Sequence, residues 1–534
     1  MRILGTMMPG LACIALTLLS ASRAIGATSL EQLASPKFGR LTQAESLVLH
    51  LAPTGETARC GPSSSVKETE PANDPSQAAR WGDTRTIRSS LIRWLYVDPR
   101  AVSMIALSGL SIHGAYIDGK LDMSRIKTDL PLQLLRSAIP KGIDLSESDV
   151  RLLDLGGSWT GAIRASNLVV RGDLLLNRGF HADGVVNLNG AKIQGALNCR
   201  EAKILIPKKE DKGDKKGQED KDDEDALLLL AANVEGNADF ADLQTNKRIE
   251  LSLSNIGGNL SFIRARFDGG RASGLSAINT QVKGALAWVN IKPNRPDIWL
   301  DLTFARVGAL ADYADSWPTY ILMNEFVYDR FDEPPEIPKD LPSRLRWLGK
   351  QPEFRPQPYM QLARVFRGVG RDHDATAVLI VKDQLERENG ATLFRPVQLS
   401  WSWFLRSTTG YGHAPIRALG WSAAIVVLGW LAFARGYRAR LMVPTEKEAC
   451  VRFTETQHVP FYYQPFSSFI YSLETFLPFV DLHQAKYWLP ARKPVPGRQV
   501  LARFLLWYLR IHILSGWILS TLFVTGLTGL LHTD

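Results

Sequence analysis

The sequence predicts a mixed fold: a parallel β-solenoid, then an α-helical hairpin and C-terminal transmembrane α-helices. Three observations lead to this class. A glycine-centred unit recurs between residues 105 and 318, a paired-helix pattern follows it, and two long apolar segments lie near the C-terminus. The chain of 534 residues is 45% apolar, which supplies enough core for several domains.

Residues 1–27 have the composition of a secretory signal. Arg2 precedes an apolar run from Leu11 to Leu19, and small residues surround Ala24–Gly26, where a signal peptidase would cut. Arg23 is unusual so close to a cleavage site, so an uncleaved N-terminal anchor is the alternative. Both interpretations place the next region, a linker or helical segment at 28–104, on the same side of the membrane.

The repeated unit has an apolar residue, any residue, glycine, any residue, and then apolar residues at alternate positions. Its copies are centred on Gly119, Gly172, Gly195, Gly236, Gly258 and Gly284, with looser copies at Gly142 and Gly308. The step from Gly172 to Gly195 is 23 residues, which matches one solenoid coil. Alternate apolar residues would face inward, and we expect the glycines to allow tight turns at positive φ.

A charged insertion at 207–225 interrupts the repeat. It consists almost wholly of Lys, Asp, Glu and Gly and cannot bury apolar area, so we expect a disordered loop projecting from one coil. A charged tether for a partner is the functional alternative. Residues 319–400 then predict a Pro-rich linker, a short helix near Arg344–Leu348 and a helical hairpin that begins at Pro358.

The membrane region is expected at 401–534. Two segments, about 415–434 and 511–531, are long and apolar enough to cross the lipid bilayer. A third, at 459–482, contains prolines and carboxylates and predicts an interfacial or re-entrant helix. Basic residues follow the first span and precede the second, which places the loop between them in the cytoplasm and the solenoid on the periplasmic side of a bacterial inner membrane. The net charge of +9 then suits phospholipid headgroups, and no nucleic acid partner is expected.

Four ionisable residues form a candidate membrane site: Glu474, Asp481, His483 and His512. Glu474 and Asp481 are seven residues apart and would share one face of a helix. Ionisable groups at membrane depth are usually functional, whereas in the headgroup layer they would merely pair with Arg and Lys. The string Thr408–Gly412 imitates a potassium-channel filter, but it precedes the first span, so a surface turn is the preferred interpretation.

The sequence offers no catalytic residue, metal ligand or cofactor site. Asp122, Asp144, Asp154 and Asp173 fall at outward strand positions, where a solvated face explains them without a polysaccharide-cleaving centre. Motifs for dinucleotides, P-loops, serine hydrolases and zinc proteases are absent from the sequence. The cofactor therefore stays unknown, and we lean against an enzyme.

The cysteines, Cys13, Cys60, Cys199 and Cys450, are too few and too scattered for a disulfide framework. A disulfide between Cys60 and Cys199 would be compatible with an oxidising periplasm. The alternative is that Cys199 fills a small core position of the repeat.

Several short strings carry a resemblance to known proteins. They are Ala196–Ala202, Ser316–Pro318, Gln357–Tyr359 with Leu362–Ala363, Tyr411–Gly412, Tyr471–Pro478 and Gly526–Leu530. In these strings the chain resembles bacterial proteins named membrane-associated oxidoreductase, with coils like those of pentapeptide-repeat proteins. The resemblance covers most of the chain from residue 105 and implies the same architecture, but no cofactor motif here matches the redox activity in that name.

Three functions stay open. The first is a membrane-anchored envelope protein, without catalytic activity, whose external solenoid offers a binding or scaffold surface to a protein or glycan. The second is a channel or transporter subunit that oligomerises through its spans and the segment 459–482; Gly516 and Ser520 would allow close helix packing in either case. The third is an envelope enzyme that acts on polysaccharide or through a redox cofactor.

Overall fold

The computed structural model describes residues 29–61, 71–207, 225–291, 298–313, 316–332, 340–390, 395–411, 413–456, 458–491 and 498–527. The predicted signal at 1–27 and nearly all of the charged insertion at 207–225 lie outside these residues. The chain divides into two compact units, 1–352 and 353–534, and each is described by itself.

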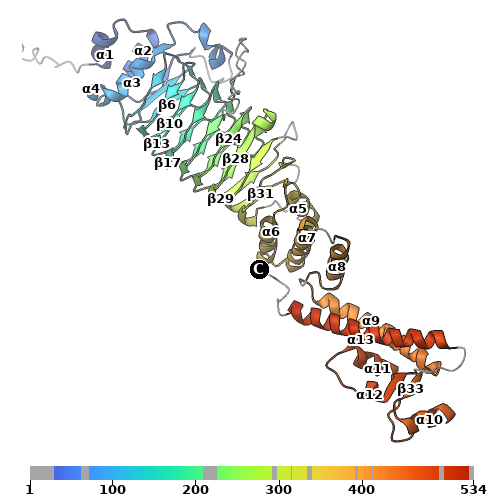
Figure 1. Ribbon diagram of the computed structural model, residues 1–534. Coiled ribbons are helices and arrows are strands. Elements are labelled where there is room, and N and C mark those ends of the chain that lie inside the picture. Colours follow the sequence, from blue (N-terminus) through green and yellow to red (C-terminus); the bar gives the residue numbers. More distant parts are fainter. Residues whose placement is uncertain are drawn as a thin grey trace, which may run out of the picture. The chain divides into compact units, whose positions relative to one another are not determined.

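Short helices cover the first end of the solenoid (Figure 1). They are α1 (Leu30–Phe38), α2 (Gln43–Leu51), η1 (Pro71–Asn73), η2 (Pro75–Arg80), α3 (Ser89–Val97) and α4 (Pro99–Val102). Capping boxes start α1 at Ser29 and α2 at Thr42, because each hydroxyl accepts a backbone N–H from the residue three positions later. Two strands in this region, β1 and β2, already pair with the first coil, so the solenoid begins earlier than residue 105.

Each coil has four sides, because successive short strands fall in turn into four parallel stacks. The first stack is β1 (Ala58–Arg59), β3 (Leu110–His113), β6 (Leu132–Leu135), β10 (Leu153–Asp154), β14 (Leu174–Leu175), β18 (Leu197–Asn198), β22 (Ala238–Asp239) and β26 (Leu260–Ser261). The second is β2 (Thr86–Arg88), β4 (Tyr116–Asp118), β7 (Ala138–Ile139), β11 (Trp159–Thr160), β15 (His181–Ala182), β19 (Lys203–Ile204), β23 (Gln244–Thr245) and β27 (Arg266–Phe267).

The third stack is β5 (Leu121–Asp122), β8 (Ile143–Asp144), β12 (Ile163–Arg164), β16 (Val186–Asn187), β20 (Leu227–Leu228), β24 (Arg248–Glu250), β28 (Gly274–Ser276) and β30 (Trp299–Asp301). The fourth is β9 (Asp149–Val150), β13 (Val169–Val170), β17 (Lys192–Ile193), β21 (Asn233–Val234) and β25 (Asn255–Ile256). The longer β29 (Gln281–Trp288) pairs with both β25 and β26, so the first and fourth stacks merge, and β31 (Arg306–Asp312) and β32 (Val327–Phe331) extend the merged sheet. The strands thus continue past residue 318.

Alternating apolar residues fill the interior, as the repeat predicts. Ile163, Val186, Leu227 and Ile249 pair in register across four coils and are all buried, while Arg164 beside them points outward. Because every coil contributes such positions on all four sides, stacking buries a continuous apolar core. The parallel β-solenoid predicted from the sequence is therefore confirmed.

The expected role of the glycines is wrong for most copies of the unit. Positive φ occurs at Gly119 and Gly142, but the copies from Gly172 to Gly284 have ordinary φ. Their reason is close approach: a Cβ on Gly236 would lie 2.7 Å from the carbonyl oxygen of Gly195, and Gly236 N donates to that same oxygen at 3.0 Å. Tight stacking of coils, rather than turning, thus excludes a side chain there.

Aromatic rings and a buried ion pair close the other end of the solenoid. Trp288 stacks on Trp317 with ring centroids 6.1 Å apart, and Trp317 packs on Trp347 of α5 (Leu341–Leu348) at 5.5 Å. The Arg344 guanidinium donates two hydrogen bonds of 2.8 Å to the carboxylate of Asp312. The predicted short helix at Arg344–Leu348 is present, and it serves as this cap.

The second unit contains helices and one small hairpin of strands. They are α6 (Pro356–Gly368), α7 (Asp372–Gly390), α8 (Arg395–Thr408), α9 (Ile416–Arg438), β33 (Met442–Pro444), α10 (Lys447–Thr456), α11 (Ser468–Phe476), α12 (Gln484–Tyr487), β34 (Trp488–Pro490) and α13 (Gln499–Leu527). Helices α6 and α7 pack as the expected hairpin. The stretch after Thr408 is a turn, with Gly410 and Tyr411 both at φ 57°.

Helices α9 and α13 are long and apolar enough to cross a membrane. The first matches the expected span closely, whereas α13 starts at Gln499, twelve residues before the apolar segment begins at Ile511. The reason is that Arg503 and Arg510 keep their side chains exposed while the backbone is already helical. Residues 528–531 of the predicted span lie outside the described residues.

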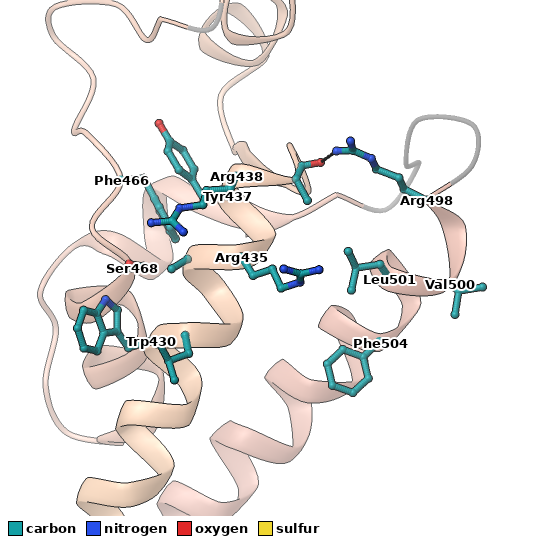
Figure 2. Close-up of a pocket in the computed structure, with 13 residues that line it drawn as sticks. Trp430, Arg435, Tyr437, Arg438, Phe466, Ser468, Arg498, Val500, Leu501 and Phe504 are labelled. Carbon is teal, nitrogen blue, oxygen red and sulfur yellow. Dashed lines mark hydrogen bonds between the residues drawn. The ribbon is translucent and has the colours of Figure 1, made fainter.

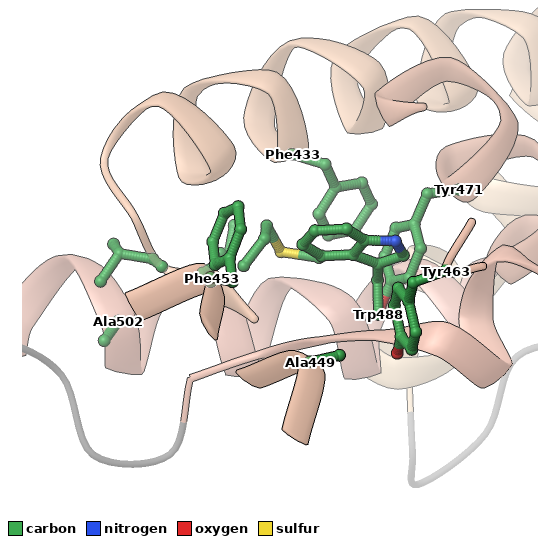
Figure 3. Close-up of a cluster of buried hydrophobic side chains, with 10 residues drawn as sticks. Phe433, Ala449, Phe453, Tyr463, Tyr471, Trp488 and Ala502 are labelled. Atoms are coloured by element: carbon green, nitrogen blue, oxygen red, sulfur yellow. The ribbon is translucent and has the colours of Figure 1, made fainter. Parts of the chain in front are cut away.

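Trp488 lies at the centre of the core formed by α9, α13 and the segment that connects them (Figure 3). Its indole is fully buried against Phe453, Tyr463 and Phe466, and Nε1 donates to the Gln464 carbonyl at 2.9 Å. Trp488 begins β34, which pairs antiparallel with β33. The connection from α9 to α13 is therefore a packed subdomain.

Candidate functional site

Helices α9 and α13 run antiparallel, and their basic ends meet. Gly436 near the end of α9 faces Leu505 near the start of α13, since a Cβ on Gly436 would lie 2.7 Å from Leu505 Cδ2. Arg498 Nη1, just before α13, donates to the Ala439 carbonyl just after α9 at 2.5 Å. The basic flanks identified in the sequence thus come from one end of a helical hairpin.

The short helix α11 packs beside the middle of both α9 and α13. Ser472 Oγ donates at 2.7 Å to the carbonyl of Val426, which is the eleventh residue of α9. His512 Nε2 on α13 donates to the Ser472 carbonyl at 3.0 Å, and Gly429 leaves the space that the imidazole fills. His512 is buried, and its Nδ1 has no hydrogen-bond partner among the described residues. Segment 459–482 therefore reaches into the hairpin without crossing it.

Of the other three candidate residues, Glu474 lies in the last turn of α11, and Asp481 and His483 lie in the turn beyond it. Glu474 Oε2 accepts the backbone N–H of Gln484 at 2.7 Å and of Ala485 at 3.1 Å, so the carboxylate caps α12. Asp481 and His483 are exposed and pair with each other at 2.9 Å. Hydrogen bonding by the His483 backbone and the charge of His483 lower the pKa of the Asp481 carboxyl.

The expectation that Glu474 and Asp481 share a helical face is wrong. Helix α11 ends at Phe476, because Pro478 stops its continuation, so Asp481 lies in the turn beyond. Among the described residues, no hydrogen bond or ion pair joins His512 to Glu474, Asp481 or His483. The sequence therefore grouped residues that belong to two separate places.

Gly516 also has a different neighbour from the one expected for span-to-span packing. A Cβ on Gly516 would lie 2.7 Å from the carbonyl carbon of Phe476, the last residue of α11. The small residue on α13 therefore allows close packing of α11 within one chain.

A groove of about 1000 Å³ opens where the basic ends of α9 and α13 meet (Figure 2). Its lining residues are Trp430, Leu431, Ala434, Arg435, Tyr437, Arg438, Ala439, Phe466, Ser468, Arg498, Val500, Leu501 and Phe504. Three of them are arginines with exposed side chains, and none of the described lining residues is a carboxylate. The groove therefore combines positive charge with an aromatic and aliphatic wall, which suits an amphipathic anion.

Sequence reasoning did not find this groove. In the sequence, Arg435, Arg438 and Arg498 indicate only basic charge beside the apolar segments, because Arg438 and Arg498 are 60 positions apart and their proximity depends on the fold. The sequence does place an aromatic residue within a few positions of these arginines: Trp430 precedes Arg435, and Phe504 follows Arg498. This is the sequence feature that could have indicated the groove.

The solenoid carboxylates have structural partners. Asp122 and Asp144 face outward on neighbouring coils. Each accepts the hydroxyl of the serine two residues later. Burial would raise the pKa of Asp144, but hydrogen bonds from Lys120 and Ser146 hold it below its ordinary value.

Two of these carboxylates bond the backbone directly. Asp173 Oδ1 accepts the Ala196 N–H of the next coil at 2.8 Å. Asp154 departs from the expected outward position: it is only 3% exposed and accepts the Gly156 N–H at 2.8 Å. Asp173 thus joins two neighbouring coils, and Asp154 stabilises the turn that follows its own strand.

The described residues contain three cysteines, and their thiols and any possible metal ligands can be examined directly. Cys60, Cys199 and Cys450 are free thiols, so Cys60 and Cys199 do not form a disulfide in this structure. Cys199 is fully buried in the coil, the core position that was the alternative, and burial raises the pKa of its thiol. The described part of the chain holds no cluster of His, Cys, Asp and Glu that would bind a metal ion.

The fold and the groove together define a class: a β-solenoid protein with two apolar helices, which fits a membrane-anchored scaffold. Comparison with protein families, with curated proteins and with solved structures gives no match to this chain.

Proposed function

We propose that this chain is a membrane-anchored scaffold of the bacterial cell envelope, whose solenoid presents a binding surface on the periplasmic side of the inner membrane. One observation carries the proposal: in-register coils expose a regular array of side chains, and the same chain carries a hairpin of two apolar helices. Stacked coils form extended surfaces that repeat proteins use for binding. The likeness to membrane-associated proteins noted in the sequence supports the architecture, and we propose no redox activity from it.

Anchoring is tested first, by alkaline carbonate extraction of membranes that contain the full-length chain. An integral protein stays in the pellet, whereas a peripheral one is released. Release of the intact chain would contradict the anchor, because two apolar spans hold a protein in the bilayer under these conditions.

The scaffold surface is tested by placing a photo-crosslinking amino acid on each side of one coil region in living cells. Suitable outward positions, one on each stack, are Arg164, Lys192, Asn198 and Lys203. We expect a discrete adduct of fixed mass from one face, and glycosidase treatment then separates a glycan from a protein. Absence of any adduct from all four faces would contradict a solenoid-borne partner.

The channel subunit is the second candidate, favoured by the position of α11 beside the middle of both spans. Its test is ion flux through reconstituted protein, with Glu474→Gln and Asp481→Asn combined. Since Glu474 caps α12 and Asp481 is exposed in a turn, we expect no flux that depends on these carboxylates. Protein-dependent flux that the double substitution changes would favour the channel over the scaffold.

A further inference from the structure

The groove between α9 and α13 lies at headgroup depth if the two helices span a bilayer. Arg438 is eleven residues beyond Val427, the midpoint of α9, which corresponds to about 16 Å along the helix axis. Half of a hydrocarbon core is about 15 Å thick. The guanidinium of Arg438 therefore lies where the phosphates of one leaflet would be.

The positive charge in the groove is not neutralised by the protein. Neither Arg435 nor Arg438 has a side-chain hydrogen bond or a carboxylate partner within the part of the chain that the structure describes. Arg498 uses one N–H on the Ala439 carbonyl and retains its other donors. Three arginines thus line one opening, and the positive charge of their guanidinium groups suits a phosphate.

The groove is amphipathic along the helix direction. Figure 2 shows Arg435 between the two helices, while Trp430 and Phe504 lie further along them, away from Arg498 and Arg438. Trp430 is more than one helical turn nearer the centre of α9 than Arg435. The charged end therefore faces the headgroup layer and the aromatic end faces the acyl chains.

We propose that this groove binds one anionic phospholipid, with its phosphate held by Arg435, Arg438 and Arg498 and its acyl chains against Trp430 and Phe504. The inference rests on the proposed membrane anchoring and adds a specific lipid site to it. A soluble phosphate would match the arginines but not the apolar wall, and so the experiment includes inorganic phosphate.

The test is native mass spectrometry of the full-length chain in detergent micelles with dioleoyl phosphatidylglycerol, dioleoyl phosphatidylcholine or inorganic phosphate. We expect the wild type to retain one phosphatidylglycerol in preference to phosphatidylcholine. Each basic residue near an anionic surface gives about a fivefold gain, so R435Q/R438Q/R498Q should lower this affinity on the order of a hundredfold. The double variant R435Q/R438Q, which keeps the Arg498 contact, should lose roughly twenty-five-fold on the same scale.

A charge-matched control is R406Q/R452Q/R503Q, which removes three exposed arginines of the same unit that do not line the groove. It should retain phosphatidylglycerol as the wild type does. Equal retention by the groove variant and the control would overturn the site, and so would full displacement of the lipid by equimolar inorganic phosphate. Flotation with phosphatidylcholine liposomes separates the two proposals: wild type that floats but retains no anionic lipid refutes the groove alone, and wild type that does not float refutes the anchor.

Discussion

At the scale of single residues, the repeat glycines have no room for a side chain, and this predicts that adding one lowers the stability of the solenoid. A Cβ on Gly195 would lie 2.6 Å from the carbonyl carbon of Gly172, which cannot move without separating two coils. We expect Gly195→Ala to lower the free energy of unfolding by about 1–3 kcal/mol, the usual cost of overpacking. Urea unfolding followed by circular dichroism measures it. Gly82→Ala is the control, because a Cβ there meets nothing within 4 Å; equal effects of the two substitutions would refute the stacking argument.

The buried carboxyl of Glu45 predicts that the stability of the chain depends on pH. Burial would raise the pKa of this carboxyl, but the Arg88 side chain, hydrogen bonds from the Thr42 and Arg88 backbones and the Arg88 charge together lower it. A lowered folded-state pKa means that the stabilisation is complete above the unfolded pKa of about 4.3 and is lost as pH falls through the folded value.

Thermal unfolding of the chain between pH 3 and pH 7 checks this dependence. Glu45→Gln should lower the melting temperature near pH 7 and make its decline below about pH 4.3 less steep than in wild type. Glu31→Gln, on the neighbouring α1 and only partly buried, is the control and should leave the profile unchanged. A parallel decline in wild type and Glu45→Gln would show that other groups govern the acid limb.

The sequence predicts where the repeat glycines lie, but it does not predict why glycine is required there. The period of the glycines identified the coil, yet their backbone angles depend on how neighbouring coils approach, which only the stacked structure defines. Positive φ occurs instead at coil corners, at residues such as Asn167, Arg178 and Asp242, and the residue type at the corner varies from coil to coil. Hydrogen bonds between coils hold them there, as from Asn167 N to the Asn189 carbonyl at 2.8 Å, so no single residue type marks the corner.

At the scale of elements, α5 caps the solenoid through a buried ion pair. The Asp312 carboxylate accepts two hydrogen bonds from Arg344 and one of 2.6 Å from Trp317 Nε1. Arg344→Met leaves that carboxylate buried without its cation, and we expect the loss of about 3–5 kcal/mol of unfolding free energy. Limited proteolysis of the 340–352 region and urea unfolding measure the effect.

Two comparisons make this cap prediction specific. Arg346→Met removes an exposed arginine from the same helix and should cost less than about 1 kcal/mol. Adding Asp312→Leu to Arg344→Met should recover part of the loss, since no buried charge then lacks a partner. Similar losses for Arg344→Met and Arg346→Met would show that the ion pair does not hold the cap.

The elements were predictable where hydrophobic periodicity is long. Both long apolar helices follow from the pattern alone, whereas α5 and α11 have only eight and nine residues, so that spacing indicates a helix but not the residue at which it ends. The candidate site failed for this reason: seven residues separate Glu474 and Asp481, and the helix stops between them. The arginine groove forms only because the end of α9, near Arg438, meets the start of α13, near Arg498. A whole subdomain separates these two places in the sequence.

At the scale of the whole molecule, the antiparallel arrangement of α9 and α13 predicts which parts of the chain share one side of a membrane. Because the basic ends of α9 and α13 meet, two spanning helices would put both of these ends at one surface of the bilayer and the chain before α9 at the other. Basic residues favour the cytoplasm, so α10 should be cytoplasmic and the solenoid periplasmic. The reverse orientation would place Arg435, Arg438 and Arg498 at the outer leaflet, against that preference.

Cysteine labelling measures this orientation in a chain whose four native cysteines are replaced by alanine. Arg151→Cys in the solenoid and Glu448→Cys on α10 are both exposed positions. In intact spheroplasts, a membrane-impermeant maleimide should label Arg151→Cys and should reach Glu448→Cys only after permeabilisation. Full labelling of both after detergent treatment verifies that each thiol is reactive. The opposite pattern would put the solenoid in the cytoplasm, so its partner would have to be a cytoplasmic molecule. The bound lipid would then come from the outer leaflet of the membrane.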